Sequence, residues 1–162
     1  MYNQDRGDKQ MVDYYERIKN TREDLDYKQY QLAKDLELNS STYSLYENGF
    51  RSIPLVILDK IAQKLNTSID YLVENTDVKR YKNSKEMNYD ILLKNIKKYR
   101  KLNNLKQIDV AKIMNCTRQA WGNYEQGIRP IPIDKLIDFS KLVNKSIDFL
   151  ADKIDYEPQI KK

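Results

Sequence analysis

The 162-residue sequence contains no histidine and a single cysteine, Cys116. Histidine is the commonest general base and metal ligand in proteins, so its absence argues against most acid–base and metal-assisted catalysis. One cysteine can form neither an intrachain disulfide nor a cysteine-rich zinc site, and it favours a reducing cytoplasm. The motifs Gly-x-x-x-x-Gly-Lys-Ser/Thr and Gly-x-Ser-x-Gly are also absent. We therefore expect no enzyme activity, no metal site and no cofactor.

Glycine and proline are scarce, at four residues each, and long apolar runs are missing. The longest apolar run, Ile53–Leu58, has six residues, whereas a membrane span needs roughly 20. The first ten residues are polar and mixed in charge, unlike a secretory signal. Of the whole sequence, 33% is charged and 40% is hydrophobic, and the net charge is +5. This composition predicts a folded, helical, cytoplasmic protein without a membrane partner, and the mild basicity is compatible with a polyanionic partner.

Two copies of one unit make up most of the chain. A shift of 78 residues aligns Ile18–Val73 with Ile96–Ala151 without an insertion. The nonapeptide YENGFRSIP at residues 46–54 thereby recurs as YEQGIRPIP at residues 124–132. A unit of about 60 residues can fold alone and is too long for a solenoid repeat. The predicted organisation is a first domain at residues 10–74, a polar linker at 75–86 and a second domain at 87–155.

Each copy carries the signals of five short helices, with a helix-turn-helix in its middle. An N-cap residue opens the third helix, and a glycine able to take the left-handed conformation ends it. A proline suits the first turn of the fourth helix. A serine caps the fifth, where an aspartate two residues on complements the helix dipole. In chain order for the two copies, the signals lie at Tyr14–Ile18, Lys28, Asn39, Gly49, Pro54, Ser68 and Asp70, and at Ile91–Tyr99, Lys106, Thr117, Gly127, Pro132, Ser146 and Asp148.

Both copies resemble the helix-turn-helix domains of the XRE/Cro-repressor family of phage and bacterial regulators. The matching pattern is an arginine ending the first helix, Gln-x-x-Leu/Val-Ala in the second, Tyr-Glu-x-Gly-x-Arg after the third and a closing Ser-Ile-Asp-Tyr/Phe-Leu. The resemblance implies an all-α fold of two tandem five-helix, lambda-repressor-like domains. It also implies a structural ion pair that ties the first helix to the end of the third. These pairs are Arg22–Glu47 and Arg100–Glu125, each separated by 25 residues.

Family geometry places the outward face of the third helix in the major groove of DNA. Arginine can form two hydrogen bonds with guanine, and glutamine and asparagine can do so with adenine. A bare glycine would let the backbone approach, and simple drift explains it equally well. In the second copy this face carries Arg118, Gln119, Gly122 and Asn123. An ordinary polar surface is the alternative interpretation. The positions that match phosphate contacts of the family are Lys106, Gln107, Thr117 and Arg129, with Lys28, Gln29 and Arg51 in the first copy.

The reading face of the first copy is different, with Ser40, Ser41, Ser44 and Leu45. Serine can bond to any base and discriminates little, while Leu45 could contact a thymine methyl or a protein partner. Residues 9–74 hold nine basic and eleven acidic side chains, whereas residues 87–162 hold fifteen and nine. Because phosphate binding depends on cationic contacts, we expect the second copy to supply most of the DNA affinity. The first would be a weaker reader or a dimerisation module.

The leading hypothesis is therefore a sequence-specific DNA-binding transcriptional regulator, most simply a repressor, acting on double-stranded DNA at the nucleoid. Two domains in one chain can act as a covalent pseudo-dimer. Homodimerisation through the first copy is equally compatible with the sequence. The alternative function is a protein-interaction module on the same fold, such as an antitoxin, an antirepressor partner or a phage-encoded inhibitor. The acidic first copy, which could take a protein partner, motivates this alternative.

Overall fold

The computed structural model describes residues 14–161, which form ten helices and no strand. The helices of the first domain are α1 (Tyr14–Glu23), α2 (Gln29–Asp35), α3 (Ser40–Glu47), α4 (Leu55–Lys64) and α5 (Ile69–Leu72). Those of the second are α6 (Tyr89–Leu102), α7 (Gln107–Ile113), α8 (Arg118–Glu125), α9 (Ile133–Val143) and α10 (Ile147–Leu150). The predicted all-α fold of two tandem domains is confirmed. Residues 10–13 of the predicted first domain lie outside the described residues.

Side-chain caps and glycines set the limits of the third helix in each domain. Asn39 and Thr117 each accept a hydrogen bond from the backbone N–H three residues on, at 2.7 and 3.1 Å. Gly49 and Gly127 both have φ of 72°, the left-handed conformation that ends a helix. The prolines before α4 and α9 differ slightly from expectation, because they occupy the N-cap and not the first turn. Four residues separate α2 from α3.

The two domains share their backbone irregularities as well as their helices. Five residues of the first domain have positive φ, and each has a counterpart 78 residues later. The pairs are Asp26 and Asn104, Glu37 and Asn115, Gly49 and Gly127, Asn66 and Asn144, and Glu74 and Asp152. A left-handed backbone is uncommon outside glycine, so its recurrence at one spacing indicates the same turns in both copies.

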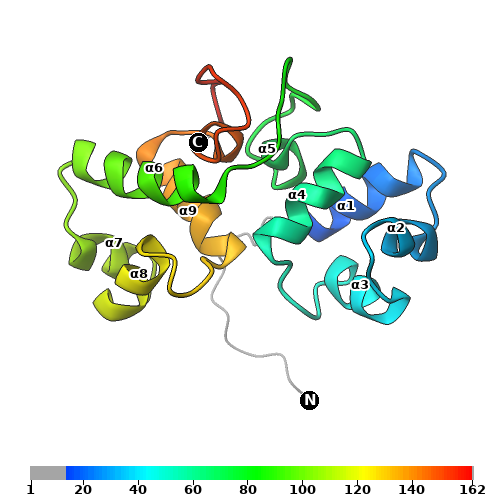
Figure 1. Ribbon diagram of the computed structural model, residues 1–162, viewed down its shortest axis with the longest axis horizontal. Helices are drawn as coiled ribbons and strands as arrows, with labels where there is room; N and C mark the ends of the chain where they lie inside the picture. Colours follow the sequence, from blue (N-terminus) through cyan, green and yellow to red (C-terminus); the bar gives the residue numbers. More distant parts are fainter. Residues whose placement is uncertain (1–13, 162) are drawn as a thin grey trace.

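One apolar core runs through both domains. Its largest fully buried side chains include Tyr43 and Leu58 in the first domain, and Trp121 and Phe139 in the second. Helices α4 and α9 lie towards the middle of the molecule, and the helix-turn-helix pairs α2–α3 and α7–α8 lie at its two ends (Figure 1). Helices α5 and α10 contact each other across the domain boundary. The fold therefore sets α3 and α8 far apart on one joined body.

The aspartates of α5 and α10 act across the domain boundary. From sequence, each was expected to complement the dipole of its own helix. Each does lie in the first turn of its own helix, and the Asp70 carboxylate also accepts hydrogen bonds from the backbone N–H groups of Ile147 and Asp148, at 2.9 and 3.0 Å. The Asp148 carboxylate accepts from Ile69 and Asp70, at 3.2 and 2.7 Å. Both carboxylates are fully buried, so each domain completes the start of a helix in the other.

Candidate nucleic-acid interface

Helix α8 is held in place by a buried ion pair with α6. Arg100 Nε and Nη2 donate to the two carboxylate oxygens of Glu125, both at 2.7 Å. Glu125 also accepts from the Trp121 indole at 3.1 Å and from the Gln107 amide at 3.4 Å. Arg100 and Glu125 are both buried. Helices α6, α7 and α8 thus meet at one cluster of satisfied polar groups, which fixes the orientation of α8.

The first domain anchors α3 in the same way. Arg22 Nε and Nη2 donate to the Glu47 carboxylate at 2.8 and 2.6 Å. Tyr43 and Gln29 donate to the same carboxylate at 2.6 and 2.8 Å. Burial alone would raise the pKa of Glu47, but these three donors lower it below its ordinary value. The pKa of Glu125 is lowered by the corresponding balance, so both carboxylates are ionised at neutral pH.

The outer face of α8 brings together the reading side chains predicted for the second domain. Arg118 and Gln119 lie exposed in its first turn, and Asn123 is half-buried one turn later. Among residues 14–161, none of these three side chains has a hydrogen-bond partner. Gly122 is buried, and a Cβ added there would lie 3.7 Å from the Gln107 side chain. Gly122 therefore lies beneath Gln107 and leaves Arg118 and Gln119 as the outermost polar groups.

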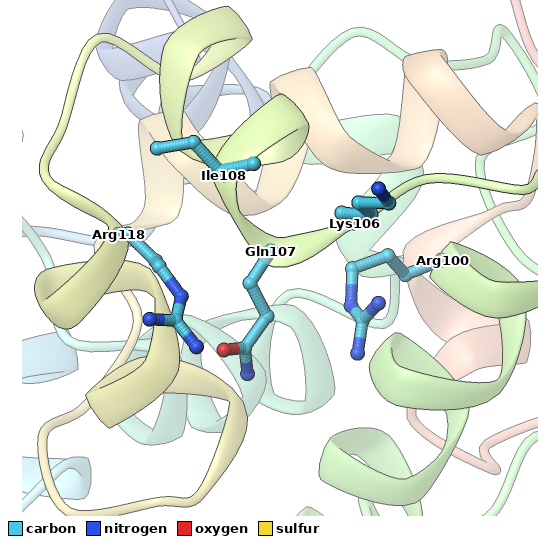
Figure 2. A pocket seen from close by; sticks show the side chains of 5 residues that line it. All are labelled: Arg100, Lys106, Gln107, Ile108 and Arg118. Carbon is cyan, nitrogen blue, oxygen red and sulfur yellow. The ribbon is translucent and has the colours of Figure 1, made fainter.

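A shallow basic recess lies beside this face, between α7 and α8 (Figure 2). Its volume is about 570 Å³, and it is lined by Arg100, Lys106, Gln107, Ile108 and Arg118. Figure 2 shows the ends of the Arg118, Gln107 and Arg100 side chains along one edge of the recess. Arg100 is paired with Glu125, so Lys106 and Arg118 are the exposed cations of the lining, and with the Gln107 amide they suit a phosphate oxygen. Ile108 was not predicted as a site residue, although its place directly after Gln107 in the first turn of α7 was an available signal.

The remaining phosphate candidates of the second domain surround the same helix starts. Lys106 is the N-cap of α7 and is exposed. Arg129 is exposed in the loop after α8. The Thr117 hydroxyl oxygen caps α8 by accepting the Ala120 N–H, which leaves its own proton as a donor. Gln107 already donates to Glu125, so only its second N–H and its carbonyl oxygen are open to a ligand.

The corresponding face of α3 offers fewer groups for base reading. Ser40 and Ser41 are exposed, Ser44 is half-buried and Leu45 is exposed. Ser41 donates its hydroxyl proton to Asn39 at 2.8 Å, so its donor is used within the helix cap. Short hydroxyls reach less far than arginine or glutamine and accept from or donate to any base. The structure thus places a short, weakly discriminating surface where the second domain presents Arg118 and Gln119.

Phosphate contacts of the first domain face more negative surroundings. Lys28 and Arg51 are exposed, and the Arg51 guanidinium lies over the Tyr46 ring at 5.8 Å. Gln29 is hydrogen-bonded to Glu47, as Gln107 is to its carboxylate. Three exposed acidic residues precede α2, Glu23 at the end of α1 and Asp24 and Asp26 in the turn after it. Their charge lies beside the phosphate candidates at the start of α2 and opposes an approaching phosphate backbone.

Two helix-turn-helix pairs, each anchored by a buried ion pair and each presenting an outer helix to solvent, define a DNA-binding protein of the helix-turn-helix class. The helix-turn-helix family model matches residues 18–72 and 96–150, more than half of the chain. The chain therefore belongs to the XRE family of helix-turn-helix regulators and carries two tandem copies of its domain. No curated protein and no solved structure matches it. Among the described helices, none is both long and apolar enough to cross a membrane.

Proposed function

We propose that the chain is a sequence-specific transcriptional repressor that reads the major groove mainly with α8. The observation that carries this proposal is the pair Arg118 and Gln119, exposed and without partners among the described residues, beside a recess whose lining includes the exposed Lys106. Arginine discriminates guanine and glutamine discriminates adenine through paired hydrogen bonds. Cations at the helix starts position the protein on the phosphates. Occlusion of a promoter by this contact needs no catalytic group.

The first domain contributes less to affinity and to sequence choice under this proposal. Its reading face offers serine hydroxyls, and its phosphate candidates lie beside exposed carboxylates. Lys28 and Arg51 nevertheless remain exposed at the positions that Lys106 and Arg129 occupy in the second domain. We therefore assign the first domain a supporting contact with the DNA backbone, and the second domain the specific one.

Gel-shift titration at two salt concentrations tests the proposal. The probe is a duplex obtained by selection with the intact chain, and the matched variants are Arg118→Ala and Arg129→Ala. Arg118→Ala should weaken the selected duplex by about 1–3 kcal/mol and leave random DNA nearly unchanged. Arg129→Ala should weaken both duplexes alike and reduce the slope of log affinity against log salt by about 1. Equal effects of the two variants on both duplexes would contradict base reading by Arg118.

A protein-interaction module on the same fold is the second candidate function. It is favoured by Phe50, which is 79% exposed in the loop after α3, and by the exposed Leu45 on that helix. Exposed apolar side chains suit a protein surface better than a phosphate backbone. This function predicts no retention of any duplex at either salt concentration, so the same titration separates the two candidates.

A further inference from the structure

The contacts between α5 and α10 follow a twofold rule. Asp70 accepts from the backbone of residues 147 and 148, and Asp148 accepts from the backbone of residues 69 and 70. Each of these contacts becomes its reciprocal when the residues are exchanged across the 78-residue repeat. The two domains therefore contact each other through equivalent surfaces, which is the isologous arrangement of a symmetric dimer.

Buried polar contacts on either side continue this interface. Lys153 is 2% exposed and forms an ion pair with Asp59 on α4. Asn75 Nδ2 donates to Ser140 on α9 at 3.0 Å. Asn75 and Lys153 occupy equivalent repeat positions, and each reaches the fourth helix of the other domain. Separation of the domains would strand these buried groups, so the two domains form one body.

The segment between the domains is fastened to this interface. Lys85 N–H donates to the Lys153 carbonyl, and Asn88 N–H donates to the Ala151 carbonyl, both at 2.9 Å. Tyr81 is 3% exposed and packs edge-on against Tyr156, with ring centroids 6.1 Å apart. Residues 75–86 are therefore fastened to the domains at several points, although most of their side chains are exposed, and they do not behave as a free tether.

The joined body presents both recognition helices to one side. In Figure 1, α3 and α8 lie along the same lower edge, away from α5 and the C-terminal segment. A twofold relation gives the two helices inverted directions, which is the arrangement that dimeric helix-turn-helix proteins use for two half-sites on one face of a duplex. The α5 surface that could pair with a second chain is already covered by α10.

We infer that one chain alone is a complete two-half-site DNA-binding unit, and that its operator joins one sharply specified half-site to an inverted, loosely specified one. The inference rests on the proposed function. The sharp half-site belongs to α8 with Arg118 and Gln119, and the loose one belongs to α3 with Ser40 and Ser41. A symmetric palindrome bound by two chains is the arrangement that this inference rejects.

Spacing and stoichiometry test the rigid-unit part with the intact chain. The selected duplex is compared with versions carrying about 5 or about 10 extra base pairs between the half-sites, half a turn and one turn of DNA. Both insertions should lower affinity to the same level, that of a duplex whose loose half-site is replaced by random sequence, because a rigid unit cannot follow the displaced half-site. Native mass spectrometry of the uninterrupted complex should give one chain per duplex. Recovery at the longer insertion would indicate a free tether, and two chains per duplex would overturn the inference.

A graft tests the unequal half-sites. Ser40→Arg, Ser41→Gln and Leu45→Asn together give α3 the side chains that α8 carries at the equivalent positions. Selection with this variant should return a near-palindrome of the sharp half-site. The mirror control, Arg118→Ser, Gln119→Ser and Asn123→Leu, should return two loose half-sites. An unchanged operator after the graft would overturn the inference while leaving DNA binding intact. Loss of all retention by the unmodified chain would instead overturn the proposed function.

Discussion

Removal of the Glu125 carboxylate should greatly lower the free energy of unfolding of the second domain. Glu125→Ala leaves the buried Arg100 guanidinium without its two short hydrogen bonds and the Trp121 indole without an acceptor. A broken buried ion pair costs about 3–5 kcal/mol, and a stranded buried donor costs about 1–3 kcal/mol. Gln107 is half-exposed and can turn to water, so it adds little. We expect a loss near 5 kcal/mol, comparable with the whole stability of a marginal domain at about 5–15 kcal/mol.

Urea unfolding followed by tryptophan fluorescence measures this loss locally. Trp121 is the only tryptophan in the sequence and is fully buried in the second domain. The matched variant Glu47→Ala breaks the equivalent pair in the first domain, which has no tryptophan. If the domains unfold as one body, Glu47→Ala also shifts the fluorescence transition, and circular dichroism coincides with it. A loss below about 1 kcal/mol for Glu125→Ala would refute the reasoning, because an ion pair exposed to solvent contributes no more than that to stability.

Three further outcomes are expected. Arg118→Ala should lower affinity for the selected duplex in fluorescence anisotropy by about 1–3 kcal/mol, and an unchanged affinity would remove Arg118 from the reading face. Ser40→Ala with Ser41→Ala should cost less than the Arg118 variant in the same assay; abolished binding would reverse the ranking of the domains. Burial and the neighbouring Asp70 raise the pKa of Asp148 well above its ordinary value, so the folded state favours the protonated form. The contribution of Asp148 to stability is therefore full at acid pH and is lost as pH rises through the raised pKa. The urea midpoint of the wild-type protein should fall over this pH range, and Asp148→Asn should flatten that fall. A wild-type midpoint that does not fall would contradict this prediction.

Local signals in the sequence account for much of the fold. The N-caps Asn39 and Thr117 and the left-handed Gly49 and Gly127 lie where the pattern indicates, because capping depends on a few neighbouring residues. The 78-residue repeat also indicates that the two copies share the same turns. It does so even at left-handed residues other than glycine, which the sequence of one copy alone does not identify. Periodicity and capping act within one domain, and within one domain they predict well.

The sequence pattern did not predict the contacts between the domains. The placement of Asp70 and Asp148 at each other's helices depends on how two folded units meet, and the pattern within one copy favours the simpler local role. Lys153 has the appearance of a solvated surface charge in the sequence, yet it is buried against Asp59. Gly122 lies beneath Gln107, a contact between two helices that the sequence pattern of one helix does not show.

The central claim is that α8 reads base sequence. Selection of bound duplexes from a random pool by the intact chain, followed by sequencing, tests it most directly. We predict one enriched asymmetric motif, with a sharp half that contains a guanine matched to Arg118 and an adenine matched to Gln119. A retained pool with no enriched motif would show binding to the phosphate backbone alone and would contradict sequence reading by α8.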